Sequence, residues 1–240
     1  MLSIETKNLT KKFKEKTAVN GIELKINEGE LFALLGTNGA GKTTTIKMLS
    51  TLILPTSGEI KINGLDIIKD RQKIREILNV SPQETAIAPN LSVKENLEFM
   101  AGVYQIPNKE EKINELVKMF KLEEVLKQKA KTLSGGWQRK VSIAIALINE
   151  PKILFLDEPT LGLDVIARKE LWKIIENLKG KITILLTTHY MEEAESLSDK
   201  IGIMAKGNLV DVGTAEELIK KAGTKNFEDA FVKIATGGEL

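Results

Sequence analysis

Eight consecutive residues form a pattern that is typical of a phosphate-binding loop. The pattern is a glycine, any four residues and then Gly-Lys-Thr. Its residues are Gly36, Thr37, Asn38, Gly39, Ala40, Gly41, Lys42 and Thr43. Glycines let backbone N–H groups converge on a phosphate, and the N-terminus of a following helix adds positive potential. We expect Lys42 to reach the β- and γ-phosphates of a nucleotide, Thr43 to ligate Mg²⁺, and Thr44 to be a further nucleotide contact.

Two adjacent carboxylates, Asp157 and Glu158, follow the apolar segment 152–156. Side chains alternate along an extended chain, so the two groups cannot face one ion in the same way. Asp157 fits a ligand of Mg²⁺, and Glu158 fits the residue that orients and polarises an attacking water. Without the phosphate loop, such a pair would more often be a helix cap or a surface feature.

The segments that position these residues have the patterns of buried strands. Residues 30–35 predict a strand ahead of the loop, and a helix is expected to open at Lys42. Further strands are predicted at 77–81, 152–156, 182–187, 201–204 and 209–212, and helices at 165–178 and 191–197. This alternation implies right-handed crossovers and a parallel sheet, which places ligands at the carboxyl ends of its strands.

Four other segments lie outside this alternation. Residues 2–9 and 18–26 alternate apolar and polar side chains, and 59–62 is a short strand, which indicates an antiparallel sheet with one solvated face. The stretch 89–150 is helical in pattern, with a capping box formed by Ser92 and Glu95.

Near the C-terminus, Thr214 and Glu217 form a second capping box ahead of a last amphipathic helix. Its apolar side chains are Phe227, Ala230, Phe231 and Ile234. We expect this face to pack on the core.

Composition excludes several other kinds of site. The 240-residue chain has no Cys and one His, which excludes disulfides, thiolate chemistry and zinc sites of the usual type. A net charge of +2 gives no general reason to expect nucleic-acid binding. No segment resembles a secretory signal, and no apolar stretch approaches the ~18 residues that a membrane span needs. The sequence therefore predicts a globular cytosolic protein, unless a partner holds it at a membrane.

Two familiar kinds of phosphate-loop enzyme fit poorly. A GTPase would need an N/T-K-x-D element for base recognition, and the chain contains none. A small-molecule kinase would need an Arg-rich lid, and Arg is sparse here beside Lys. Neither class explains a second glycine motif, which begins a predicted helix: Leu133, Ser134, Gly135 and Gly136.

With that motif between the phosphate loop and the Asp-Glu strand, the chain resembles the nucleotide-binding domain of ATP-binding cassette (ABC) ATPases over about residues 2–220. The resemblance implies that two copies pair head to tail. Ser134 and Gly136 of one copy, with Ser134 as a helix N-cap, would then cap the γ-phosphate held by the other.

The resemblance also implies roles for four further residues. Gln83 matches the Q-loop residue, which reaches Mg²⁺ or the attacking water and senses the membrane partner. Asp164 matches the D-loop, and His189, the only histidine, matches the switch histidine that hydrogen-bonds the γ-phosphate. Phe13 matches the aromatic residue that stacks on adenine, which is usually Tyr in the family.

Two positions depart from the family pattern. The motif at residues 133–136 matches the family's signature motif, and Trp137 replaces the Gln that commonly ends it, which is compatible with capping by backbone N–H groups. Ile145 stands where many members have Arg, so a helix-surface ion pair is not expected here.

The implied fold is α/β: a P-loop NTPase core of mixed parallel sheet with helices, an antiparallel β subdomain at the N-terminus and an inserted all-helical signature subdomain. We expect a nucleotide-binding domain over residues 1–220, with its catalytic core at about 1–88 and 151–220 and the helical subdomain at about 89–150. Residues 221–240 are expected to be a short helical extension.

The implied function is an ATP- and Mg²⁺-dependent ATPase subunit of a transporter, similar to the stand-alone subunits of the multidrug, sodium and lipid-linked-glycan exporters. It would act as a head-to-tail homodimer, or a pseudo-dimer with a related subunit. A separate transmembrane permease subunit would hold it at the cytoplasmic face of the membrane and would contact about residues 84–100. Whether Ile87, Pro89 and Leu91 are exposed there is open.

Two alternatives remain. An ABC importer subunit would carry the same motifs, so chemistry does not separate import from export. A non-transport ABC ATPase that acts on nucleic acid or in cofactor assembly is less favoured, because the chain has one phosphate loop, no sustained heptads and little net charge. No nucleic-acid partner is therefore expected, and the transported substrate is not encoded here.

Overall fold

The computed structural model describes residues 1–238, and within this range six strands form a central sheet. They lie in the order β11-β10-β4-β9-β8-β7: β4 (Leu31–Gly36), β7 (Leu78–Ser81), β8 (Ile153–Asp157), β9 (Thr183–Thr188), β10 (Lys200–Ala205) and β11 (Asn208–Gly213). All neighbours are parallel except β10 and β11. Every residue of β4, β8 and β9 is buried, as the continuous apolar runs predict for strands covered on both faces.

A second, antiparallel sheet has the order β2-β1-β5-β6, with β3 also paired to β1. Its strands are β1 (Leu2–Phe13), β2 (Lys16–Ile22), β3 (Lys25–Asn27), β5 (Ser57–Ile62) and β6 (Leu65–Asp66). The prediction of a single strand over residues 18–26 is wrong, because strand pairing is interrupted between β2 and β3. The Thr6 hydroxyl enters the break, donating to Ile22 O at 2.9 Å and accepting from Leu24 N at 2.9 Å.

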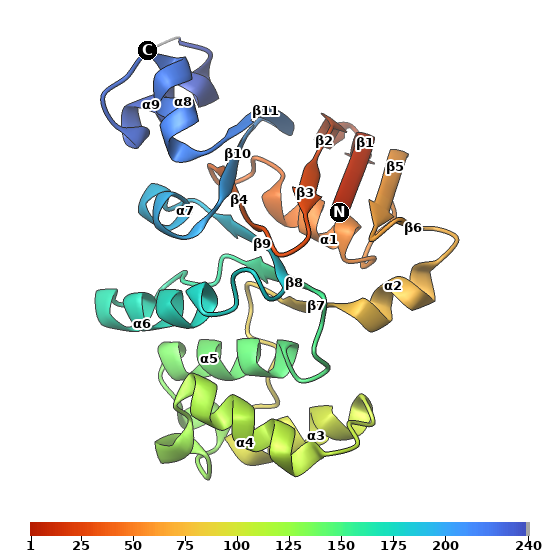
Figure 1. The fold of residues 1–240 in the computed structure, drawn as a ribbon, viewed down its shortest axis with the longest axis vertical. Helices are drawn as coiled ribbons and strands as arrows, with labels where there is room; N and C mark the ends of the chain where they lie inside the picture. Colours follow the sequence, from red (N-terminus) through yellow and green to blue (C-terminus); the bar gives the residue numbers. More distant parts are fainter. Residues whose placement is uncertain (239–240) are drawn as a thin grey trace.

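Helices cover both faces of the central sheet (Figure 1). They are α1 (Lys42–Leu49), α2 (Arg71–Ile77), α6 (Val165–Glu176), α7 (Met191–Leu197), α8 (Ala215–Ala222) and α9 (Phe227–Thr236). Alternate side chains of β4 pack on opposite faces of the sheet. Phe32 and Leu34 join the hydrophobic cluster of α1 and the antiparallel sheet, whereas Leu31, Ala33 and Leu35 join that of α6, α7 and α9.

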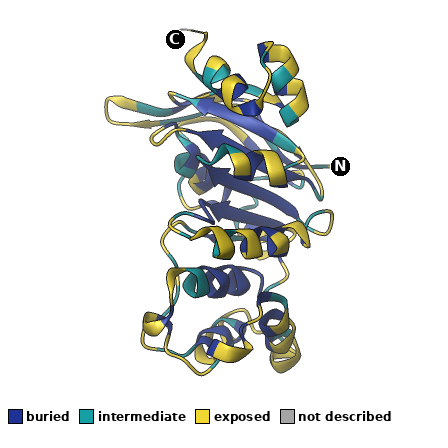
Figure 2. Cartoon of the chain, turned by 90° about the vertical axis from the view of Figure 1, so that its left-hand side faces the viewer, coloured by how far each residue is buried: buried dark blue, intermediate teal, exposed yellow. Residues whose placement is uncertain are grey.

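A helical layer occupies one end of the molecule (Figure 1). It contains α3 (Val93–Val103), α4 (Lys109–Phe120), α5 (Gly135–Ala146) and two 3₁₀ turns, η1 (Glu123–Val125) and η2 (Ala130–Thr132). The capping box of Ser92 and Glu95 at the start of α3 is confirmed, and its backbone hydrogen bond lowers the pKa of Glu95. Figure 2 shows α5 as mostly buried. Ile145 is therefore in the core and takes no part in a helix-surface ion pair.

The C-terminal helices pack against the edge of the central sheet. Phe227, Ala230 and Phe231 of α9 are buried, and Ile234 packs against the same cluster, which confirms the expected core face. The capping box of Thr214 at the start of α8 is also confirmed. The last two residues of the extension expected at 221–240 lie outside the described residues. None of the helices in residues 1–238 has the length and apolarity needed to cross a membrane.

We predict that Phe120→Ala lowers the free energy of unfolding by about 3–5 kcal/mol, because it leaves a cavity where a fully buried ring stood. Urea denaturation followed by circular dichroism measures this loss. The matched control is Phe99→Ala in α3, where the ring is 61% exposed, and it should change stability by no more than about 0.5 kcal/mol. Equal losses in the two variants would contradict the assignment of Phe120 to the core.

Candidate active site

The loop between β4 and α1 borders a cavity of about 440 Å³. Residues 38–44 form one wall, and the other lining residues come from four further segments: Lys16, Ala18, Gln83, Glu158, Leu161 and His189. Gly41 closes the loop at a φ of 106°, and a Cβ there would lie 2.5 Å from Ala18 O. Only glycine fits this position, because both the backbone angle and the close approach exclude a side chain.

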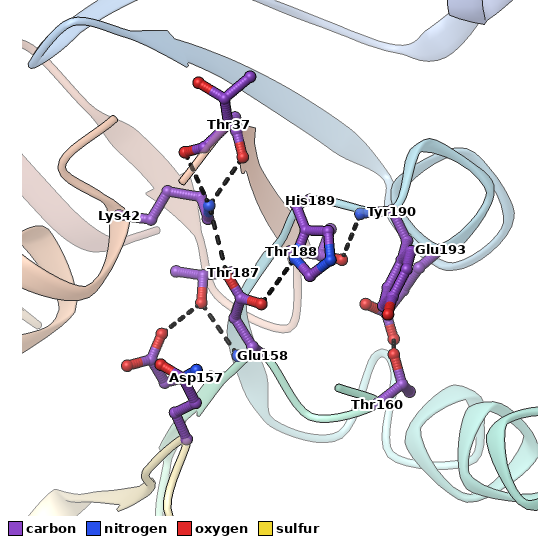
Figure 3. A network of polar contacts seen from close by, with 12 residues as sticks. Thr37, Lys42, Asp157, Glu158, Thr160, Thr187, Thr188, His189, Tyr190 and Glu193 are labelled. Carbon is purple, nitrogen blue, oxygen red and sulfur yellow. Dashed lines mark hydrogen bonds and ion pairs between the residues drawn. The ribbon is translucent and has the colours of Figure 1, made fainter. Parts of the chain in front are cut away.

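Lys42 is buried at the base of this cavity, with 4% of its surface exposed. Its Nζ donates to Gly36 O at 2.7 Å and to Thr37 O at 3.2 Å (Figure 3). The same ammonium lies 3.3 Å from Glu158 Oε1. The loop carbonyls and one carboxylate therefore hold a positive charge where the glycine loop meets α1.

Both the backbone N–H and the side chain of Glu158 are held by contacts with neighbouring residues. Its φ is 48°, a left-handed value that is rare outside glycine, and its N–H donates to Thr187 O and Thr187 Oγ1, each at 3.1 Å. The carboxylate lies between Lys42 and His189, whose Nδ1 is 2.7 Å from Glu158 Oε2. Strained backbone of this kind clusters at functional sites.

Asp157 is the last residue of β8, and its side chain has a different set of partners because the backbone leaves the extended conformation at Glu158. Its Oδ1 accepts from Thr43 Oγ1 at 3.1 Å and from Thr187 Oγ1 at 2.6 Å. Together with the Gln83 amide in the cavity lining, these oxygens are the hard donors that suit Mg²⁺. Residues 1–238 contain no cluster of three or more His, Cys, Asp or Glu that would hold a metal alone. Mg²⁺ fits this donor set, because it is usually bound by one or two protein groups plus substrate phosphates.

Several expected site residues lie outside this cavity. The Phe13 ring is 48% exposed at the end of β1, where its register partner is Lys16 of the cavity lining. Asp164 caps α6, accepting from Ile166 N and Ala167 N at 2.9 Å each. Phe13 thus pairs with a residue that lines the cavity, and Asp164 caps its own helix.

The four signature residues also lie away from the cavity of their own chain. Ser134 is the N-cap residue of α5, as expected, but its side chain makes no capping hydrogen bond. Leu133 is buried, whereas Ser134 and Gly135 are exposed and Gly136 is half-buried. The N-terminus of α5 thus presents Ser134 to the surroundings rather than to the phosphate loop.

Thr187 and Arg139 hold the site together, and sequence reasoning missed both. Thr187 bridges Asp157 to the backbone of Glu158, and its signal is a hydroxyl at the end of an apolar strand. Arg139 of α5 donates to Pro82 O at 2.6 Å and to Gln83 O at 2.5 Å, anchoring the segment that carries Gln83. Burial lowers the pKa of Arg139 from its ordinary value. No local pattern indicates this contact, because the partners are 56 and 57 residues apart.

Comparison with known proteins identifies a family whose members are similar to this chain. The family described as "ABC transporter" matches residues 19–161. The phospholipid-transporting ATPase ABCA3 of Homo sapiens is 42% identical over 92% of this chain, and the probable multidrug ABC transporter ATP-binding protein YbhF of Escherichia coli (strain K12) is 38% identical over 96%. This chain spans only 13% and 41% of their respective lengths. The linearmycin resistance ATP-binding protein LnrL of Bacillus subtilis (strain 168) is 37% identical, with 98% of this chain and 75% of LnrL covered.

Solved structures share the fold. A structure of the ATP-binding subunit of an ABC transporter matches with a TM-score of 0.87 and 30% identity, covering 98% of this chain and 99% of that one. The ATP-binding cassette MJ0796, as a dimer in a post-hydrolysis state bound to ADP and Pi, matches with a TM-score of 0.79 and 28% identity over 88% of this chain and 98% of that one.

We predict that Thr187→Val lowers the rate of ATP hydrolysis by about 10–100-fold, because Asp157 loses its shortest hydrogen bond and Glu158 N–H one of its two acceptors. Steady-state phosphate release at saturating Mg²⁺ measures the effect. Thr187→Ser keeps the hydroxyl and should stay within about threefold of the unmodified chain. A Val variant as active as the Ser variant would show that this hydroxyl does not support the site.

Proposed function

This chain belongs to the ABC transporter family and forms an ATPase cassette of that family; on this premise, we propose that it drives export through a separate transmembrane subunit. The observation that supports ATP hydrolysis as its power source is the carboxylate of Glu158, held between Lys42 and His189 beside the glycine loop. A family that hydrolyses ATP needs a group that orients water against the γ-phosphate, and we assign that role to this carboxylate.

ATP binding would use the loop and the start of α1. Backbone N–H groups of residues 36–44 and the N-terminal end of α1 would receive the phosphates, and the Phe13 ring would stack on adenine. Lys42 would exchange the loop carbonyls and Glu158 for β- and γ-phosphate oxygens. Thr43, Asp157 and Gln83 would hold Mg²⁺, which neutralises the charge that develops on the phosphates.

Hydrolysis would then depend on Glu158. Its carboxylate would orient a water molecule in line with the γ-phosphorus and accept the proton that the water loses. A new bond forms from the water oxygen to phosphorus as the bond to the β–γ bridging oxygen breaks, which releases ADP and phosphate. His189 would hold the Glu158 carboxylate and contact the γ-phosphate, so the protein's contribution is mainly positioning.

The second phosphate contact would come from another copy or a related subunit. Dimers are known among the structural relatives, as for the MJ0796 cassette. Head-to-tail pairing is supported by Ser134, which is exposed at the N-terminus of α5 with no capping hydrogen bond. Near Asp164, Val165 and Ile166 are 57% and 75% exposed and would be covered in such a pair.

Export is supported by the relatives, among which are a multidrug and a resistance protein. The membrane subunit would dock at residues 84–100, at the cytoplasmic face of the membrane. Within this segment Pro89 is exposed, Ile87 and Leu91 are half-buried, and Phe99 is 61% exposed.

We also propose the division of residues 1–220 into a core at about 1–88 and 151–220 and a helical subdomain at 89–150.

Glu158→Gln should lower ATP hydrolysis by about 10²–10⁴-fold, because an amide accepts no proton from water, while ATP binding survives. Phosphate release and nucleotide titration measure the two properties. Size-exclusion chromatography with ATP should show a dimer that accumulates. Activity near that of the unmodified chain would remove Glu158 from the role of base.

The membrane partner is tested with tagged Glu158→Gln chain, used to capture proteins from detergent-solubilised membranes of the native organism in the presence of ATP. We expect a protein with several membrane spans in about equal molar amount, identified by mass spectrometry. Its sequence would separate an exporter from an importer. Adding Phe99→Asp should abolish capture but not ATP binding. Recovery of only non-membrane proteins or nucleic acid would contradict the transport proposal.

A further inference from the structure

Glu193 is a buried carboxylate to which the proposed mechanism assigns no role. It lies in the first turn of α7, four residues after His189, and it is 0% exposed. Burial raises the pKa of its carboxyl above the ordinary value. A carboxylate in such a position is costly, and an apolar side chain of similar volume would be a cheaper way to fill the space.

The Oε1 atom of Glu193 joins three segments. It accepts a hydrogen bond from Thr160 Oγ1 at 2.9 Å and from Trp172 Nε1 at 3.0 Å. Thr160 lies two residues after Glu158, in the turn that leads to Asp164, and Trp172 belongs to α6. Figure 3 shows Thr160 and Glu193 facing each other beside the pair of Glu158 and His189. The carboxylate therefore ties the turn after β8 to the helix after β9.

A second contact connects the same segments. The Arg168 guanidinium of α6 lies 5.5 Å from the centre of the Trp172 ring and 5.7 Å from that of Tyr190. Tyr190 directly follows His189, and their ring centres are 4.2 Å apart. Arg168 also pairs with Glu192 at 3.3 Å. Arg168 and Trp172 of α6 thus contact residues on both sides of the start of α7. Trp172 makes its contact with Glu193.

We propose that Glu193 is a positioning residue for ATP hydrolysis. By holding Thr160, it fixes the turn that begins at Glu158 against the helix that begins after His189, which keeps the Glu158 and His189 side chains in contact. This role accounts for a carboxylate at a position where packing alone does not need one. It rests on the proposed function of Glu158, because a positioning residue matters only if the pair it positions carries out hydrolysis.

The main test is Glu193→Met, which replaces the carboxylate with an apolar side chain of similar length. We expect kcat for ATP hydrolysis to fall by about 10–100-fold, because a small displacement of Glu158 is enough for such a loss. The dissociation constant for ATP should change by less than about twofold, since the phosphate loop is untouched. Glu193→Gln keeps an oxygen that accepts from Thr160 and should recover most of the lost kcat.

A matched control separates positioning from simple stabilisation. Glu30 is also a buried carboxylate, 8% exposed, and it accepts from Asn27 just before β4, at the end opposite the glycine loop. Glu30→Met should lower the melting temperature but leave kcat unchanged. If Glu193→Met fails to fold, Thr160→Val removes the same hydrogen bond with a side chain of equal size, and Thr160→Ser restores it.

A double-mutant cycle shows whether Glu193 acts through His189. In a His189→Ala background, Glu193→Met should cost less than about threefold in kcat if the two residues serve one unit. Additive losses, an unchanged kcat in Glu193→Met, or equal losses of kcat and ATP affinity would overturn the inference while leaving the effect of Glu158→Gln intact. A chain that fails to hydrolyse ATP at all would instead overturn the proposed function, and the inference with it.

Discussion

The ion pair of Lys42 and Glu158 is the interaction on which the rest of the structure depends. Both side chains are buried, at 4% and 9% exposure, and two opposite charges in such a place are tolerated only when further hydrogen bonds satisfy them. The Gly36 and Thr37 carbonyls supply these bonds for the ammonium, and His189 supplies one for the carboxylate. The fold therefore has to bring a glycine loop, a strand end and a histidine from three separate segments to one point.

The order of the central strands meets this requirement. β4 lies beside β9, and β9 lies beside β8, so the carboxyl ends of three parallel strands meet at one edge of the sheet. The glycine loop leaves β4, Asp157 ends β8, and His189 directly follows β9. Thr187 pairs with Asp157 across the ladder and receives the Glu158 N–H, so the register of the sheet itself sets the positions of the carboxylates.

Helices then connect the edge of the sheet to the outer surfaces that the proposed partners would use. Arg139 joins the helix that begins at the signature to the backbone of Gln83, and Glu193 joins the turn after Glu158 to the helix after His189. In both cases a buried polar side chain spans elements that are far apart in sequence. Such contacts transmit a displacement because the packed interior deforms little.

The sequence by itself determined the phosphate loop, the Asp-Glu strand end, the capping boxes at Ser92 and Thr214, and the α/β class, because each rests on residue types at short spacing. Tertiary structure alone decided that Thr6 splits an expected strand, that Ile145 is buried, and that Thr187, Arg139 and Glu193 form hydrogen bonds to distant segments of the chain. These residues make their contacts with partners about 20 to 60 positions away, or through the side of a helix that faces the core. Local periodicity carries no information on such pairings, which depend on the order and register of strands and on how the helices pack across them.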